Sequence, residues 1–304
     1  MFYDDKCRPS EKCQRTVIFM KVLVTGSFGF TGRFVCEELI NNEHSICRLS
    51  SDLTDSKASS DEIDSIKPDA VIHLAAVAFV GFDNANSFYE VNLVGTRNLL
   101  LALSNSSKNL KSVLIVSSAN VYGNHSGGAL NEEVNPNPVN DYAVSKLAME
   151  KMANLWIKKL PIVIVRPFNY TGLGQDISFL IPKIVAHFQA KKTTIELGNL
   201  DVWREFGDVR TVSIIYRKLL ELGPTGELFN ICTGQPYSLR EVVALCQKIT
   251  GHSITVKVNP EFIRDNEIKV LKGDNSRLKG RLYDWPQHEL EETLSWMLNT
   301  TKSD

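Results

Sequence analysis

A tyrosine and a lysine four residues apart form the pair in this 304-residue chain that is best suited to proton chemistry. Tyr142 and Lys146 stand in the segment YAVSK, and this spacing places both on one face of any helix that carries them. A free tyrosine has a pKa of about 10, too high for ready proton exchange at neutral pH. A lysine one turn away is expected to lower the phenol pKa with its positive charge. The pair predicts an enzyme that transfers a proton through a phenol.

Two adjacent serines supply the next candidate groups. Ser117 and Ser118 end the apolar run Ser112–Ser118, and the end of a buried strand is where parallel sheets bind their ligands. Neighbouring strand residues point to opposite faces, so one of the two faces the reactants. We expect Ser118 to hydrogen-bond the reacting oxygen, with Ser117 as the second candidate.

Three glycines predict a dinucleotide site near the start of the chain. Gly26, Gly29 and Gly32 follow the apolar run Val22–Val24 at spacing GxxGxxG. Glycine lets the backbone approach a pyrophosphate closely, and the following helix offers unpaired amides and the positive end of its dipole. A glycine triplet alone is weak, and a purely structural turn is the alternative, but a strand before it and a helix after it are the context the motif needs. Together with the phenol and the amine, this predicts an enzyme that moves a hydride and a proton.

The choice of dinucleotide depends on the end of the second expected strand, Ser45–Cys47. An acid there would bind the ribose hydroxyls of NAD, whereas an arginine accommodates the 2′-phosphate of NADP. Arg48 ends the strand and Arg33 follows the last glycine. Two cations favour NADP(H), with NAD(H) as the alternative if both arginines are solvated surface charges.

Unbroken apolar runs alternate with helical segments over the first half of the chain. Such runs predict an α/β fold, a Rossmann-type doubly wound parallel sheet covered on both faces, for residues 20–170. The expected strands are Val22–Val24, Ser45–Cys47, Ala70–Ala76, Ser112–Ser118 and Pro161–Arg166, and the expected helices are 31–40, 83–106 and 142–159.

After residue 170 the alternation weakens. Residues 171–304 are expected to form mainly a smaller mixed α/β substrate domain over the edge of the sheet, although the chain has room to cross back to the first domain. Its expected strands are 195–197, 228–232, 254–258 and 268–271, with helices near 211–222, 239–250 and 287–298.

Composition excludes several classes of function. A net charge of -1 gives no electrostatic attraction to nucleic acid or to an anionic membrane. No apolar run approaches the ~20 residues of a membrane span, and the six histidines show no metal-ligand spacing. Six cysteines without a CxxC pair predict free thiols in the cytoplasm, leaving a Cys7–Cys13 disulfide open. Residues 1–19 are charged, without the apolar core of a signal peptide, and are expected to be a disordered leader.

The order of motifs resembles the extended short-chain dehydrogenase/reductase family, of the NAD-dependent epimerase/dehydratase type. The resemblance covers residues 21–298 and rests on TGxxGFxG, HLAA (73–76), VNxxGT (91–96), SSxxVYG (117–123), YxxxK and RPFN (166–169). Within the family it is strongest to the GDP-6-deoxy-D-mannose reductase branch, on RPFNYTGLGQ (166–175), GNLDVWREF (198–206) and NICTG (230–234). That branch reduces a nucleotide-linked 4-keto-6-deoxyhexose.

The resemblance implies further site residues. Around the cofactor it places, besides the glycines, Arg33, Arg48, Tyr142 and Lys146, the residues Phe28, Phe30, Asp52, Leu53, Leu74, Ala75, Ala76, Asn92 and Pro167. Asn92 is expected to support Lys146, and Asp52 with Leu53 to meet the adenine. Around the substrate it places Ser118, Asn120, Asn169, Phe179, Arg204, Arg264 and Glu267. Arginine suits a diphosphate because its planar fork donates two bonds at once; surface ion pairs with Glu205 and Asp265 are the alternatives for Arg204 and Arg264.

Departures from the family pattern narrow the reaction. Dehydratases of the family carry an acidic pair directly after the serine, as β-elimination needs general acid–base groups. This chain has Ala119 and Asn120 there, which disfavours dehydration, and Thr211 stands where an acid is common.

Three functions remain open: a 4-keto reductase, a 4-epimerase that keeps its NAD bound, and a non-catalytic cofactor-sensing protein. The family also implies a homodimer through the stretches 87–106 and 142–159, with Met149, Met152 and Trp156 in the seam or, alternatively, in an ordinary core.

Overall fold

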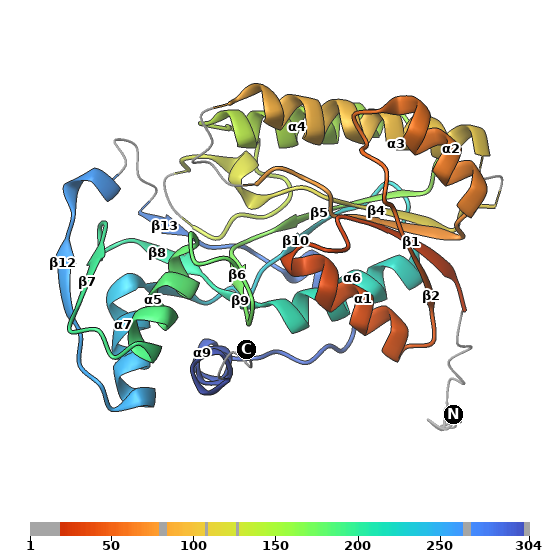
Figure 1. Ribbon diagram of the computed structural model, residues 1–304. Helices are drawn as coiled ribbons and strands as arrows, with labels where there is room; N and C mark the ends of the chain where they lie inside the picture. Colours follow the sequence, from red (N-terminus) through yellow and green to blue (C-terminus); the bar gives the residue numbers. More distant parts are fainter. Residues whose placement is uncertain (1–18, 79–83, 107–108, 126–127, 264–268, 301–304) are drawn as a thin grey trace, which may run out of the picture.

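A six-stranded, wholly parallel sheet forms the centre of the molecule (Figure 1). The computed structural model describes residues 19–78, 84–106, 109–125, 128–263 and 269–300. The strand order is β10-β5-β4-β3-β1-β2, with β1 at Lys21–Thr25, β2 at Ser45–Arg48, β3 at Ala70–His73, β4 at Ser112–Val116, β5 at Ile162–Pro167 and β10 at Leu228–Ile231. The predicted doubly wound α/β fold is confirmed.

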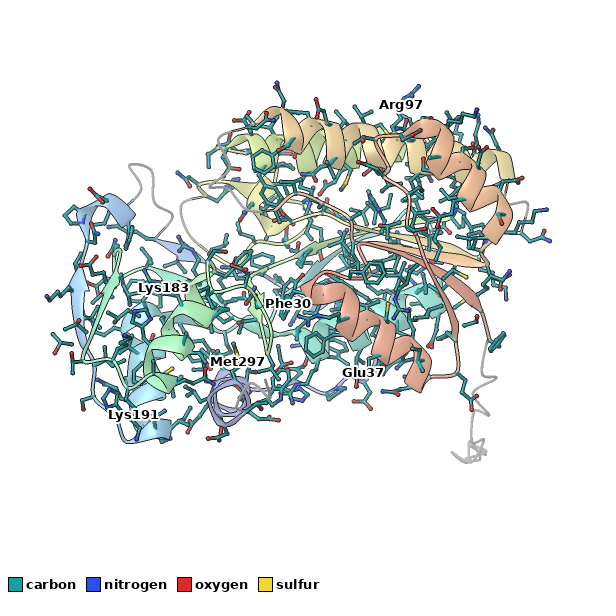
Figure 2. The ribbon with its side chains drawn as sticks, in the orientation of Figure 1. Phe30, Glu37, Arg97, Lys183, Lys191 and Met297 are labelled. Carbon is teal, nitrogen blue, oxygen red and sulfur yellow. The ribbon has the colours of Figure 1, made fainter. Side chains whose placement is uncertain are left out.

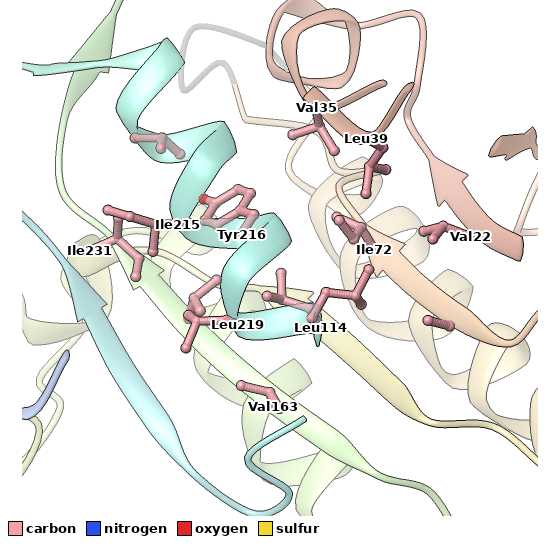
Figure 3. Packing of buried hydrophobic residues seen from close by; sticks show 14 of the residues in the cluster. Val22, Val35, Leu39, Ile72, Leu114, Val163, Ile215, Tyr216, Leu219 and Ile231 are labelled. Carbon is pink, nitrogen blue, oxygen red and sulfur yellow. The ribbon is translucent and has the colours of Figure 1, made fainter. Parts of the chain in front are cut away.

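Helices cover both faces of this sheet, which explains why its strands are apolar without alternation. One face carries α2 (Ser56–Ile66), α3 (Thr96–Ser106) and α4 (Asp141–Asn154), and the other carries α1 (Phe30–Asn41) and α6 (Val209–Leu222) (Figure 1). Figure 3 shows the second interface, where Tyr216 and Leu219 of α6 pack against Ile72 and Leu114 of the sheet. Two buried layers of side chains therefore fix the sheet whose edge carries the site.

The chain returns to the large sheet after residue 207. The expected strand at 228–232 is β10, which pairs with β5 in parallel register, Phe229 opposite Val165. It was expected among the short strands of the substrate part, but its backbone pairs with the edge of β5, and α6 before it covers the sheet face. The α6–β10 segment is thus one more helix–strand unit of the large sheet.

The remaining elements form a second body with its own core, seen on the left of Figure 1. It contains a three-stranded sheet in the order β11-β8-β13 and a parallel β12–β7 pair. Its strands are β7 (Thr194–Leu197), β8 (Trp203–Glu205), β11 (Pro236–Ser238), β12 (Thr255–Val258) and β13 (Val270–Leu271), and its helices are α5 (Leu180–Gln189), α7 (Leu239–Thr250) and α9 (Leu290–Asn299). A short parallel pair, β6 (Tyr170–Thr171) with β9 (Gly207–Asp208), lies where the two bodies meet. We call this body the substrate half and the large sheet with its helices the cofactor half.

Several element bounds differ from the sequence-based prediction. The helix expected at 142–159 ends at Asn154, because turns through Trp156 lead the chain directly into Pro161 and β5. The segment expected as one helix at 83–106 is a π-helix, η1 (Phe88–Gly95), that continues into α3. The remaining short elements are η2 (Ala119–Tyr122), η3 (Pro260–Phe262) and α8 (Ser276–Arg281).

Three features of composition can be checked on the described residues. Cys36, Cys47, Cys232 and Cys246 are free thiols, whereas Cys7 and Cys13 lie outside the described residues. No helix in the described part of the chain is long and apolar enough to cross a membrane. Across the same residues, no group of three His, Cys, Asp or Glu side chains could hold a metal ion.

Candidate active site

Tyr142, Lys146 and Ser118 come together at the carboxyl edge of the large sheet. Asn140 caps α4 by accepting a hydrogen bond from the Ala143 amide at 2.9 Å, which fixes the first turn that carries Tyr142. Ser118 follows β4 with an extended backbone, and a side-chain hydrogen bond joins it to Tyr142. Its hydroxyl also accepts the Asn120 amide at 3.2 Å. All three side chains are nearly buried, with 8 % exposure for Tyr142 and Ser118 and 3 % for Lys146.

The Tyr142 phenol is less acidic than the spacing alone suggested. Burial raises its pKa to about 12, and the hydrogen bond with Ser118 only partly opposes this. The expected lowering by Lys146 is therefore wrong for the protein without its ligands, because desolvation of the phenolate dominates. Burial likewise lowers the pKa of Lys146 to about 8, opposed by the carboxylate of Glu150. At neutral pH the site thus holds a protonated phenol and a charged amine.

Lys146 is tied to the strand that carries the serines. Its Nζ donates to the Val116 carbonyl, two residues before Ser118, at 2.9 Å. Ser117 also contacts α4: its hydroxyl donates to Glu150 Oε1 at 2.5 Å. Both serines therefore bond side chains on the same face of α4, and of the two only Ser118 bonds the phenol.

Asn92 bonds the side chain of Ser145, the residue before Lys146. Its amide bonds both backbone groups of Val77, at 2.9 and 3.1 Å, and donates to the Ser145 hydroxyl at 3.0 Å. It lies in the π-helix η1, a form often found at functional sites. In the same helix Phe88 contacts the Tyr142 ring edge-on, with centroids 5.9 Å apart. Asn92 therefore braces the loop after β3 against α4, next to Lys146 in the chain.

The glycine cradle has the geometry that the motif requires. Gly26 adopts φ of +67°, and a Cβ there would lie 2.8 Å from the Ala75 amide nitrogen. A Cβ on Gly32 would lie 2.3 Å from the Gly26 carbonyl oxygen. Helix α1 begins after Gly29 without a side-chain cap, so its first-turn amides have no side-chain acceptor and face the cradle with the positive end of the dipole.

The loop after β3 closes the cradle on its other side. His73 bonds Thr25 through Nδ1 at 2.7 Å and Thr96 through Nε2 at 2.8 Å, and Thr25 accepts the Ala75 amide at 3.1 Å. These contacts hold the half-buried Leu74, Ala75 and Ala76 beside Gly26.

The arginines expected at the cofactor ribose differ in their surroundings. Arg48 is exposed at the end of β2, with its guanidinium 5.8 Å from the centre of the Phe28 ring. Arg33 donates to the Gly174 carbonyl at 3.0 Å, which links the cradle to the chain after RPFN. Asp52 is exposed and accepts the Thr54 amide, and Leu53 is buried, held by Asn98 through its carbonyl.

Phe30 and Pro167 lie where the halves meet. Phe30 begins α1 (Figure 2) and stacks on Tyr170, with centroids 6.2 Å apart. The Tyr170 hydroxyl in turn bonds Thr31 at 2.7 Å. Pro167 ends β5 beside β4.

On the substrate side, Arg204 and Glu205 face opposite ways. Arg204 donates to the Trp203 carbonyl, whereas Glu205 is buried at 1 % exposure and accepts the amides of Thr233, Gly234 and Gly273 at 2.6 to 3.0 Å. Because Glu205 is buried among backbone amides, it is not an exposed surface partner for Arg204. Glu205 instead holds the loops of the substrate half together.

The other expected substrate residues have mixed outcomes. Asn169 is exposed and lines a cleft with Phe206 and Tyr237, and Tyr237 stands opposite Arg204 on the same face of the small sheet. Phe179 caps α5 and is 37 % exposed. Asn120 is half-buried beside Ser118. Arg264 and Glu267 lie outside the described residues.

The chain matches a known family over most of its length. The model of the NAD dependent epimerase/dehydratase family matches residues 22–232. This chain belongs to that family. It is 40% identical over 268 residues to GDP-6-deoxy-D-talose 4-dehydrogenase of Aggregatibacter actinomycetemcomitans, covering 85% of this chain and 90% of the relative. It is 34% identical to GDP-6-deoxy-D-mannose reductase of Pseudomonas aeruginosa, covering 78% and 81%.

Solved structures agree with this membership. A putative epimerase from Burkholderia cenocepacia has 45% identity and a TM-score of 0.88, covering 92% of this chain and 97% of that one. RMD from Pseudomonas aeruginosa complexed with NADPH has 31% identity and a TM-score of 0.84, covering 92% and 96%. The predicted membership of the extended short-chain dehydrogenase/reductases is confirmed, and the protein is an NAD(P)-dependent enzyme of the epimerase/dehydratase family.

The residues at the cradle of this family member fit such a cofactor. The tight turn at Gly26 leaves no room for a Cβ, and the uncapped start of α1 supplies donors for a pyrophosphate. The cofactor would lie between these amides and the Tyr142–Lys146 face of α4.

The segment that departs from the family pattern has local partners of its own. Asp208 is buried, pairs with Arg210 at 2.7 Å and accepts the Thr293 hydroxyl at 2.7 Å. Thr211 bonds the Pro286 carbonyl and His288, and it lines the same cleft as Asn169. The bond between Asp208 and Thr293 joins the start of α6 to α9.

Sequence reasoning missed three residues around the site: Glu150, Glu205 and Tyr170. A carboxylate about two helical turns after Tyr142, on the same helix face, was a usable signal for Glu150. No local pattern marks Glu205 or Tyr170, because their partners lie 28 to 139 residues away.

Proposed function

We propose that this enzyme reduces the C4 keto group of a nucleoside-diphospho-4-keto-6-deoxyhexose, with a GDP-linked sugar favoured and NADPH as the reductant. The two relatives described above are named for GDP-linked 6-deoxysugars, one as a 4-dehydrogenase and one as a reductase. The two names describe oxidation and reduction, which are the two directions of one type of hydride transfer. Nucleotide-sugar 4-epimerases are also among the relatives, at 26% identity for UDP-glucose 4-epimerase of Lactobacillus helveticus.

The observation that carries the proposal is the pairing of Ser118 with a protonated Tyr142 and no further acid. With a pKa of about 12, the Tyr142 phenol keeps its proton at neutral pH, which a proton donor to a developing alkoxide needs. Neither Ala119 nor Asn120 can titrate, so the groups for a β-elimination are missing at the positions that follow Ser118. The site supports a redox step with one proton transfer.

The chain's own groups divide this work. Ser118 would hydrogen-bond the C4 oxygen, and Tyr142 would give it the proton. Lys146, charged at neutral pH, would lie near the cofactor ribose and stabilise the phenolate that remains. The dinucleotide, when bound, supplies the hydride to C4. Burial of all three side chains keeps water away and strengthens their electrostatic effect.

NADP(H) is favoured by the charge at the end of β2. Arg48 is exposed there and no acid stands beside it on the strand, so it can meet a 2′-phosphate. The complex of RMD with NADPH supports the same choice. Replacing Arg48 by alanine should raise the KM for NADPH about tenfold and leave that for NADH nearly unchanged.

The diphosphate end of the substrate is assigned to the face that carries Arg204. Asn169 lines the cleft beside this face, and Phe206 and Tyr237 give it apolar walls. Arg264 and Glu267, expected here by resemblance, remain candidates.

The deciding experiment is NADPH oxidation by the purified protein with GDP-4-keto-6-deoxymannose, and with the TDP- and UDP-linked analogues alongside. Loss of absorbance with one of them is expected and would identify its base. Stoichiometric NAD in the purified protein together with C4 epimer exchange would establish the epimerase instead. Cofactor binding without any turnover would favour a sensing role.

We further propose that the enzyme is a homodimer formed through α3 and α4. The described residues of these helices leave Leu101 and Val144 exposed, at 36 % and 39 %. Met149, Met152 and Trp156 pack in the chain's own core instead. Sedimentation at micromolar concentration should give a dimer, and a Leu101→Glu variant a monomer; a monomeric wild type would contradict the proposal.

A further inference from the structure

Glu150 lies directly behind the catalytic groups but touches none of the reactants. It follows Tyr142 and Lys146 at the same four-residue interval on α4, and all three are buried. A carboxylate with 3 % exposure is costly unless it is paired. Its position on the same helix face as Tyr142 and Lys146 therefore indicates a role beyond packing.

Glu150 joins three elements. Its Oε1 accepts the Ser117 hydroxyl at 2.5 Å and Arg166 Nε at 2.9 Å, and its Oε2 accepts Arg166 Nη2 at 2.6 Å. The carboxylate thus binds the end of β4 and the end of β5 to α4. Arg166 is fixed in turn by Tyr122, whose ring lies 4.8 Å from its guanidinium.

The contact with Ser117 determines where Ser118 points. Two contacts hold the strand end to α4, Lys146 to the Val116 carbonyl and Glu150 to Ser117. Both serines bond the same face of α4, Ser117 through Glu150 and Ser118 through Tyr142. With Ser117 held by Glu150, the backbone that carries Ser118 is held beside Tyr142.

The charges around Lys146 give Glu150 a second role. The charged or titratable groups that act on this amine are Glu150 from α4 itself and His73 from β3, with Arg166 of β5 behind Glu150. Burial holds His73 neutral. Without Glu150, two buried cations would stand near each other with no anion between them, and Lys146 would lose its proton more readily.

We propose that Glu150 is a positioning residue for catalysis, which aligns Ser118 through Ser117 and supplies the anion one helical turn from the buried amine of Lys146. The inference rests on the proposed function for its effect on turnover but not for its effect on Lys146. It predicts different effects for substitutions of the two residues. Ser117 contributes only to the alignment of Ser118, whereas Glu150 contributes both to that alignment and to the charge of Lys146.

The test compares Glu150→Gln with Ser117→Ala. In the protein labelled with [13Cε]lysine and free of substrate, the NMR titration midpoint of Lys146 should fall by about one pH unit in Glu150→Gln and stay in place in Ser117→Ala. The signal is assigned with a Lys146→Arg variant. In turnover, the alkaline limb of kcat/KM should move by the same shift in Glu150→Gln, and kcat should fall about tenfold in both, with the KM for NADPH unchanged.

The matched control is Glu221→Gln, which removes a carboxylate paired with Arg217 at 2.7 Å on α6, remote from the site. It should move neither the midpoint nor the limb. If Glu150→Gln does not fold, the Glu150→Gln/Arg166→Gln double variant removes both charges of the pair, and the midpoint should still lie below that of the wild type.

An unmoved Lys146 midpoint in the folded single or double variant would overturn the inference. A moved midpoint in a protein that turns over no 4-keto sugar would leave the inference standing and reject the proposed function. A purely structural Glu150 would lower the melting temperature without moving either pH readout.

Discussion

The ends of β4 and β8 solve the same problem in different ways. At each, a candidate site residue stands next to a buried neighbour: Ser118 with Ser117 at β4, Arg204 with Glu205 at β8. Both strands lie between two others, β4 between β3 and β5 and β8 between β11 and β13. Strand β8 has only three residues and pairs over a shorter length, and one buried carboxylate holds the surrounding loops.

The difference shows which contacts fix the geometry of each half. The cofactor half depends on a long backbone ladder and on two layers of apolar packing, to which many residues contribute. The substrate half depends on Glu205, which accepts three backbone amides. An unpaired amide in a buried place costs about 1 to 3 kcal/mol, so its geometry depends on one residue.

The largest effect should come from the group that does the chemistry. Replacing Tyr142 by phenylalanine removes the proton donor and should lower kcat at least about 10³-fold. Because the cradle is held by backbone and by Thr25 and His73, the Kd for NADPH should change less than about threefold. Fluorescence titration of the cofactor and steady-state kinetics measure the two values. Near-normal turnover would remove Tyr142 as the donor.

A substitution in the glycine cradle should lower both the stability of the fold and the affinity for the cofactor. In Gly32→Ala the added Cβ would lie 2.3 Å from the Gly26 carbonyl oxygen, and neither backbone can move aside. We expect a loss of about 3 kcal/mol in the free energy of unfolding and a Kd for NADPH raised at least about a hundredfold, measured by chemical denaturation and titration.

Gly280→Ala in α8 is the matched control, because a Cβ there meets nothing within 4 Å. It should leave the cofactor Kd unchanged and stabilise the helix slightly. If the two variants bind NADPH alike, the cradle does not form the site.

At β8 we expect a substitution to weaken binding of the sugar and to leave binding of the cofactor unchanged. Glu205→Gln replaces an acceptor by a group that must also donate, and should cost about 2 to 3 kcal/mol. It should raise the KM for the nucleotide sugar about tenfold, with the Kd for NADPH unchanged. Glu291→Gln, which breaks the exposed pair with Lys248, is the control and should cost less than about 0.5 kcal/mol. Equal losses of sugar and cofactor binding in Glu205→Gln would show that the two halves are one cooperative unit.

Local sequence patterns predict one part of this structure and not another. The five sheet strands before residue 170, the glycine cradle and the Ser118–Tyr142–Lys146 set were predictable, because apolar runs, i to i+4 spacing and strand-to-helix turns are local patterns. The early end of α4 and the π-helix at Phe88–Gly95 depend on turns that propensity does not record.

The substrate half was harder to predict for a physical reason. Its contacts join residues far apart, such as Glu205 with Gly273 and Asp208 with Thr293, and no periodicity encodes them. The prediction that Lys146 lowers the pKa of Tyr142 failed for the same reason. The spacing to Lys146 is local, but the burial that dominates the pKa comes from residues throughout the fold.

Mild acid should destabilise the cofactor half before the substrate half, and this is the smallest of the predicted effects. Burial, aided by the charge of Lys146, lowers the pKa of His73 from 6.5 to about 3. Between these values the unfolded chain binds the extra proton, so stability is lost as the pH falls through this window, by about 2 kcal/mol at about pH 5.

The buried carboxylate of Asp208, where the two halves meet, responds at lower pH. The hydrogen bonds from Arg210 and Thr293 outweigh burial and lower the pKa of Asp208 below its usual 3.8, so its contribution is still intact at about pH 5. Hydrogen exchange followed by mass spectrometry, as protection factors at about pH 7 and about pH 5, should therefore show opening of peptides around 70–76 and 96–103 before those around 203–208. A non-titrating His73→Asn variant should lose the difference. Equal loss of protection in both regions would mean that acid opens the molecule as a whole, and that the backbone-held half is no more independent than the half held by Glu205.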